Sequence, residues 1–127
     1  MTTPDANKAL VRRFLDALGS GDVAGAAACF DSERYYSHAW EGDLAVTWEK
    51  MKALRRTQSF VDWASETVAL VADGDRVVHH SHSRFTDMAS GRRLDFHSLE
   101  IWRIEDGLIV EHWGGMREGE RLREQLA

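Results

Sequence analysis

The apolar positions at the start of the chain repeat with the period of an α-helix. Thr3, Pro4 and Asp5 are typical of a helix start: a hydroxyl cap, a proline at the first helical position and an acid in the first turn. One apolar face follows, formed by Leu10, Val11, Phe14, Leu15 and Leu18. Gly19 is expected to end this helix.

Further elements are predicted before residue 58. Asp22 can cap a short helix whose apolar side is Val23, Ala26, Ala27 and Phe30. The stretch from Tyr35 to Trp40 is typical of a short strand. Gly42 and Asp43 then precede a third helix, with a broad apolar face of Leu44, Trp48, Met51 and Leu54.

After Thr57 the period of the apolar pattern changes from that of a helix to that of a strand. Four consecutive strands are predicted, over residues 60–72, 76–86, 92–104 and 108–114. The first and last connections contain Asp-Gly, which tolerates the positive φ of tight hairpins. Helices followed by a strand meander predict an α+β fold, with a curved antiparallel sheet packed against the helices.

Composition narrows the classes of function. The chain has 127 residues, 43% of them apolar, which fits one globular domain. Its net charge of −5 argues against binding to nucleic acid, which needs a basic face. With no apolar run close to the roughly 20 residues of a membrane span and no signal-peptide pattern, we expect no membrane association. The single cysteine, Cys29, excludes an intrachain disulfide and favours a cytoplasmic location.

Three stretches of the chain read NKALVRRFLDALGSGDVAGAAACF, VALVADGDRVVHHSHSRF and RRLDFHSLEIWRIEDGLIVEHWGG. They resemble the SnoaL-like polyketide cyclases. These belong to the nuclear transport factor 2-like or cystatin-like superfamily, which also contains ketosteroid isomerases and limonene epoxide hydrolases. The resemblance covers about residues 7–116. It implies a cystatin-like cone in a single domain over residues 1–127, with three N-terminal helices on a curved antiparallel sheet and a charged tail at 117–127.

The resemblance also implies positions for the chemistry. The tyrosine that ketosteroid isomerases use in their oxyanion hole falls at Phe14, which has no hydroxyl. Their general-base aspartate falls at or near His38, and their protonated acid falls at Glu100. The acid that commonly follows the His-Trp pair of SnoaL-like cyclases falls at Gly114. We therefore expect His38 as base and Glu100 as acid or oxyanion partner, with His82 as a third catalytic candidate.

Alternation along each strand divides its side chains between two faces. The resemblance, and not the alternation, selects the face that looks into the cone. On that basis the predicted cavity lining is His38, Trp63, His80, His82, Arg84, Glu100, Trp102 and His112, with Phe14 and Trp40 as further substrate contacts. His79 and His97 are expected on the outer face, where members of the superfamily often form homodimers.

Alternatives remain open for two of these groups. Burial among tryptophans would keep Glu100 protonated, so that it could donate a hydrogen bond to an enolate. Pairing with Arg84 on the neighbouring strand would instead keep it ionised. His80 and His82 have the spacing of a metal-binding pair, but the carboxylate that follows such a pair in cupins is missing. We expect neither a metal nor a cofactor.

These residues predict an enzyme of SnoaL-like type that acts by general acid–base catalysis on a small apolar ring compound carrying a carbonyl, such as a polyketide or a steroid-like molecule. Enolate-type cyclisation, isomerisation and dehydration share the same first step. One alternative is a non-catalytic protein that binds a small hydrophobic ligand on the same scaffold. A second alternative is an enzyme like an epoxide hydrolase, for which Arg84 is available but two partnering aspartates are not evident.

Overall fold

The computed structural model describes residues 3–57, 60–116 and 124–125. Its helices are α1 (Pro4–Ser20), α2 (Val23–Ala27) and α3 (Leu44–Thr57). Its strands are β1 (Tyr36–Ser37), β2 (Phe60–Asp73), β3 (Arg76–Asp87), β4 (Arg93–Glu105) and β5 (Leu108–Met116). Glu124 and Gln125 are helical, whereas most of the predicted tail at 117–127 lies outside the described residues.

The helix starts follow the predicted capping chemistry. The hydroxyl of Thr3 accepts a hydrogen bond from the backbone N–H of Ala6 at 3.1 Å, and the carboxylate of Asp22 accepts one from Gly25 at 2.9 Å. Helix α1 runs slightly past the predicted end at Gly19, because Gly21 supplies the left-handed cap with φ of 79°. The strand predicted between Tyr35 and Trp40 is shorter than expected and covers only β1.

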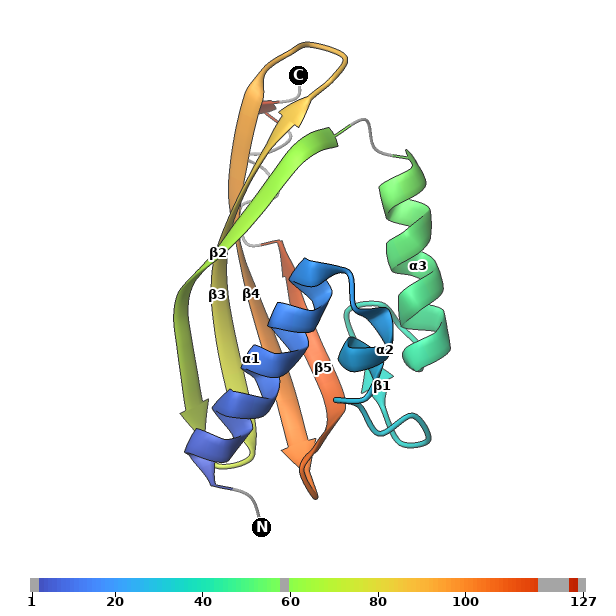
Figure 1. Ribbon diagram of the computed structural model, residues 1–127, viewed down its shortest axis with the longest axis vertical. Coiled ribbons are helices and arrows are strands. Elements are labelled where there is room, and N and C mark those ends of the chain that lie inside the picture. Colours follow the sequence, from blue (N-terminus) through green and yellow to red (C-terminus); the bar gives the residue numbers. More distant parts are fainter. Residues whose placement is uncertain (1–2, 58–59, 117–123, 126–127) are drawn as a thin grey trace.

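The strands of the described chain form one mixed sheet in the order β1-β5-β4-β3-β2. Neighbours are antiparallel except β1, which pairs with β5 in parallel. Strands β2 to β5 match the four predicted segments within two residues at each end. Figure 1 shows the helices gathered on one face of this curved sheet, with α1 lying across it. The α+β prediction, with helices packed on a curved sheet, is confirmed.

The main core lies where α1 and α2 meet the inner face of the sheet. Phe14 of α1 makes edge-to-face contacts with Phe30 at 4.9 Å and with Trp102 of β4 at 5.7 Å between ring centroids. A second, smaller cluster of Phe85, Leu94 and Phe96 lies nearer the opposite end of the sheet. Between the two clusters the inner face carries polar side chains, and this is where the candidate site lies.

Candidate active site

A cleft of about 1240 Å³ lies between the helices and the inner face of the sheet. This is more than sufficient for a small organic ligand, since such sites enclose about 300–1,000 Å³. Its roof is mainly apolar and includes Phe14, Leu15 and Leu18 of α1 with Trp48 and Met51 of α3. Its floor is mainly polar and is formed by Ser65, Thr67, His79, Ser81, Ser98, Glu100 and His112. A ligand with an apolar face and a polar edge matches this division.

A hydrogen-bonded chain of three side chains crosses the floor at the β5 side. The carboxylate of Glu100 in β4 is hydrogen-bonded to Nε2 of His112 in β5. Nδ1 of His112 lies 2.8 Å from the hydroxyl oxygen of Ser37, which also accepts a hydrogen bond from the backbone N–H of Trp40. Ser37 is fully buried and His112 is 5% exposed, so this chain fixes the imidazole from behind. A carboxylate and an imidazole held in this way can exchange a proton with a ligand.

Gly114 provides the space that Glu100 occupies. These residues are register partners on neighbouring strands. A Cβ atom at position 114 would lie 2.9 Å from the backbone oxygen of Leu99 and would collide with the carboxylate of Glu100. Position 114, where the resemblance to SnoaL-like cyclases leads one to expect an acid, therefore holds a glycine, and the carboxylate beside it comes from Glu100 on the adjacent strand.

Tyr35 lies beside this chain and lines the same cleft. Burial raises the pKa of its phenol from 10.0 to about 12, with a further contribution from the charge of Glu100. The hydroxyls of Ser37 and Thr47 act in the opposite direction. Tyr35 is therefore a neutral phenol at physiological pH.

His79 occupies the floor directly opposite Glu100. Its Nε2 lies 2.9 Å from the hydroxyl oxygen of Thr67 in β2, and the residue is 6% exposed. Burial lowers the pKa of His79, and the neighbouring His80 lowers it further, so the ring is neutral at pH 7. Beside it, the hydroxyls of Ser81 and Ser98 are 2.7 Å apart and continue the polar floor.

Six of the residues predicted to line the cavity do line the cleft: Phe14, Trp40, Trp63, Glu100, Trp102 and His112. Trp63 stacks on Phe85 at 4.7 Å and donates a hydrogen bond from its indole N–H to Ser65 at 3.0 Å. Trp102 stacks against His112 at 5.6 Å. Their positions agree with the prediction, and their roles in binding a substrate remain predictions.

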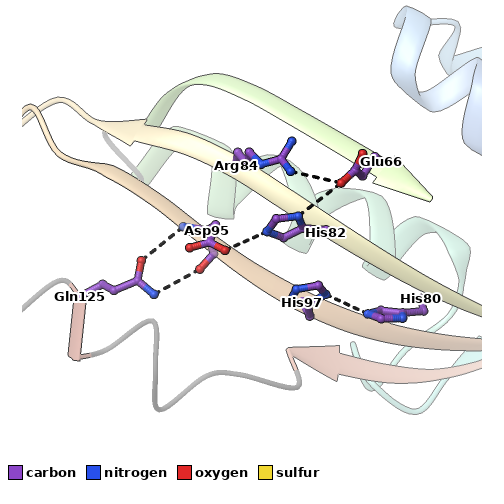
Figure 2. A network of polar contacts seen from close by, with 7 residues as sticks. All are labelled: Glu66, His80, His82, Arg84, Asp95, His97 and Gln125. Atoms are coloured by element: carbon purple, nitrogen blue, oxygen red, sulfur yellow. Dashed lines mark hydrogen bonds and ion pairs between the residues drawn. The ribbon is translucent and has the colours of Figure 1, made fainter. Parts of the chain in front are cut away.

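The predicted positions of His80, His82 and Arg84 are wrong. All three lie on the outer face of the sheet, in the network of Figure 2. His82 is bonded to Asp95 at 2.8 Å and contacts Glu66 at 3.4 Å, and Arg84 binds Glu66 at 3.2 Å. The alternative pairing of Arg84 with Glu100 is therefore also wrong.

The error in β3 is a register error of one residue. In the observed pairing His79 is opposite Glu100 and Ser81 is opposite Ser98, and directly opposed residues point to the same face. A shift of one residue transfers every side chain to the other face. The sequence does contain a signal for the observed face. The odd positions of β3 begin and end with an apolar residue, Val77 and Phe85, and both are fully buried in the structure. His79 and His97 were both expected outside; His97 does lie there, bonded to His80, whereas His79 does not.

His38 also lies away from the cleft, so its predicted position is wrong. Ser37 is the register partner of His112, and both point inward. Because side chains alternate along a strand, His38, which follows Ser37, points outward. The imidazole of His38 is 2.6 Å from the carboxylate of Glu111 and stacks on Trp113 at 5.0 Å. His38 and Arg103 together lower the pKa of Glu111 by hydrogen bonding.

No group of three or more histidine, cysteine or acidic side chains suited to a metal ion occurs among the residues that the structure describes. Within the same residues, no helix is both long and apolar enough to cross a membrane.

Comparisons with known proteins agree on the fold. The sequence profile of the SnoaL-like domain matches residues 11–112. AclR of Streptomyces galilaeus, a proposed hydroxylase, is 25% identical, with 96% of this chain and 98% of AclR covered and a TM-score of 0.75. TsrD of Streptomyces laurentii is 25% identical, with coverage of 100% and 98% and a TM-score of 0.78.

IdmH of Streptomyces antibioticus, a proposed polyketide cyclase, shares the fold at 21% identity, with coverage of 94% and 97% and a TM-score of 0.79. A comparison with curated protein sequences finds no match.

Proposed function

Because the chain belongs to the SnoaL-like domain family, we propose that it is an enzyme that acts by general acid–base catalysis, without a cofactor, on a small ring compound carrying a carbonyl. The observation that carries this proposal is the Glu100–His112 pair on the floor of the cleft. The pair lies beneath an apolar roof, where a flat ring can bind and exclude water.

Only one of the two carboxylate oxygens of Glu100 has a hydrogen-bond partner in the described part of the chain. One oxygen of Glu100 is bonded to His112, whereas Oε1 has no hydrogen-bond partner in the described part of the chain. The Glu100 side chain is 26% exposed, into the cleft, so Oε1 is open to a ligand. His112, held by Ser37, orients the carboxylate. In this proposal Glu100 is the base in place of His38, which lies outside the cleft.

The proposed first step is transfer of a proton from a carbon next to the carbonyl to Oε1 of Glu100. The electron pair of the broken C–H bond forms a carbon–carbon double bond, and the carbonyl oxygen becomes an enolate oxygen. Return of the proton to another carbon isomerises the substrate. Attack of the enolate carbon on a second carbonyl closes a ring, and the proton held by Glu100 passes to the alkoxide that forms. In dehydration, the enolate expels a hydroxyl group from the neighbouring carbon, and that group takes the proton from Glu100 and leaves as water. IdmH, a proposed polyketide cyclase with this fold, makes polyketide-type rings the first class to screen.

Exchange of deuterium into 2-tetralone in D₂O tests this step without knowledge of the natural substrate. The wild-type protein is expected to accelerate exchange at the carbons beside the carbonyl, as followed by proton NMR. Glu100→Gln removes the base at nearly constant volume, and its rate should be lower by about 10² or more. Wild-type exchange equal to the buffer rate, under conditions where 2-naphthol quenches the cleft tryptophans, would reject the enzyme.

Wild-type exchange equal to the buffer rate would favour the alternative, a non-catalytic binding protein. The observation on its side is Phe14, which places an apolar ring where isomerases of the superfamily carry a hydroxyl. For a binder, Glu100→Gln should change the affinity for 2-naphthol and nothing else.

The epoxide hydrolase alternative has no arginine in the cleft to support it. Arg84 lies on the outer face, and no arginine lines the described part of the cleft.

We also propose that the outer face of the sheet joins two copies of the chain. Helices α1, α2 and α3 lie on the other face of the sheet in Figure 1. It carries Val78, Leu99 and Ile101 in half-buried positions, which suits a partly apolar interface. Light scattering after gel filtration should give twice the mass of the chain, and a monomer at all concentrations would contradict this proposal.

A further inference from the structure

We propose that His79 is a second catalytic residue of the cleft and donates a hydrogen bond to the carbonyl oxygen of the substrate while Glu100 takes the proton from the neighbouring carbon. This inference rests on the proposed function and deepens it. The resemblance implies an outer position for His79, and the acid–base proposal above makes no use of this residue.

The register places the two groups on either side of one binding position. His79 in β3 and Glu100 in β4 are directly opposed and point to the same face, so their Cβ atoms are about 4.5–5.5 Å apart. Their side chains then lean apart: His79 is bonded to Thr67 in β2, and Glu100 is bonded to His112 in β5. A ketone lying between them can present its oxygen to His79 and the adjacent C–H to Glu100.

The hydrogen bonds of His79 leave one ring nitrogen for a ligand. Nε2 is paired with the hydroxyl of Thr67, whereas Nδ1 has no partner among the residues that the structure describes. His79 lines the cleft, and Nδ1 is not one of the buried side-chain atoms that lack a partner in the described chain, so a ligand in the cleft can reach it. When Thr67 donates to Nε2, the single proton of the neutral ring resides on Nδ1, which becomes a donor.

The neutral state suits this role. Desolvation of the nearly buried ring lowers the pKa of His79. A charged imidazolium would be drawn into an ion pair with the carboxylate opposite it. A neutral imidazole instead remains available to the substrate oxygen, and neutral histidines polarise carbonyl groups in this way in other enzymes. In the step itself the substrate proton moves to Glu100, the carbonyl electron pair moves to oxygen, and His79 keeps its own proton.

The 2-tetralone exchange assay tests this role with three substitutions. His79→Leu removes the donor and should lower kcat by about 10² with a much smaller change in KM, as for loss of an oxyanion donor. His79→Asn keeps an N–H near the position of Nδ1 and should recover at least about tenfold of that loss. Thr67→Val removes the group that orients the ring, and its rate should lie between those of the wild type and His79→Leu.

His80→Leu is the matched control, because the same change is made one residue along β3 on the opposite face. It should retain wild-type exchange within about twofold, and urea unfolding should show that each variant is folded. If Glu100→Gln loses exchange but His79→Leu keeps it, this inference is wrong and the proposed function stands. Equal rates for His79→Leu and His79→Asn, both far below the wild type, would reduce His79 to a packing residue beside Trp102. A wild-type protein with no exchange would reject both proposals.

Discussion

The two faces of the sheet each hold a histidine bonded to a carboxylate, and the comparison separates a candidate site from a structural network. In the cleft His112 is bonded to Glu100, and on the outer face His82 is bonded to Asp95. Exposure does not distinguish them: the side chains of Glu100 and Asp95 are 26% and 32% exposed. Burial of the pair is therefore a poor guide to its role.

The difference lies in the remaining hydrogen-bonding capacity. Both ring nitrogens of His82 face carboxylates, from Asp95 and Glu66, and Glu66 is also paired with Arg84. Figure 2 shows this network continuing through the backbone of Asp95 to the amide of Gln125. In the cleft, Oε1 of Glu100 and Nδ1 of His79 have no partner in the described chain. These unused donors and acceptors over a large cleft are the reason why we propose the inner face, and not the outer one, as the place where a ligand binds.

The largest expected difference between the two faces is in the exchange rate after substitution of His112 and of His82. His112→Asn should lower 2-tetralone exchange by about 10², because Glu100 loses the group that orients it. His82→Asn, the matched change on the outer face, should stay within about twofold of the wild type. NMR assays of both variants under identical conditions make this comparison. Equal losses in the two variants would mean that the faces do not differ in the way described.

A smaller effect is expected from closing the space beside Glu100. Gly114→Ala places a Cβ against the Leu99 backbone and the Glu100 carboxylate. Such overpacking costs about 1–3 kcal/mol of unfolding free energy, and displacement of the carboxylate should slow exchange about tenfold. Gly115→Ala is the control, since a Cβ there meets no described atom within 4 Å. Urea unfolding and the exchange assay measure the two effects, and identical behaviour of the two variants would contradict the account.

Tyr35, which lines the cleft, should make the free energy of unfolding depend on pH. Its pKa is raised from 10.0 to about 12 in the folded protein, so the unfolded chain loses this proton first. Stability from this group is therefore complete below pH 10 and is lost as the pH rises toward 12, by about 2–3 kcal/mol. The difference in urea-unfolding free energy between wild type and Tyr35→Phe should shrink by that amount between pH 9 and 12. A constant difference would show that burial does not raise the pKa of Tyr35.

The smallest effect is expected at the outer edge of β1. His38→Ala breaks the contacts with Glu111 and Trp113. For an exposed pair of this kind the loss of unfolding free energy should be about 0.2–1 kcal/mol. Exchange of 2-tetralone should not change. A large loss of exchange would instead restore His38 as the base that the resemblance to ketosteroid isomerases implies.

The fold was predictable because its determinants are local. The caps at Thr3 and Asp22 and the change from a helical to a strand period were enough to place the helices and the four long strands. The side of each strand was harder, because it depends on which residues of neighbouring strands are paired. Glu100 and His112 were assigned to the cleft correctly, whereas the register of β3 was off by one residue, which interchanged His79 and His80. The pairing of Ser37 with His112, and hence the outward position of His38, is a long-range contact without a local sequence signal.

The most direct test of the central claim is the rate of deuterium exchange into 2-tetralone by Glu100→Gln and Asp95→Asn, measured side by side with the wild-type protein. Both substitutions replace one carboxylate of a histidine–carboxylate pair by an amide, one on each face of the sheet. The account predicts that Glu100→Gln falls to near the buffer rate while Asp95→Asn stays within about twofold of the wild type. Retention of wild-type exchange by Glu100→Gln would contradict it.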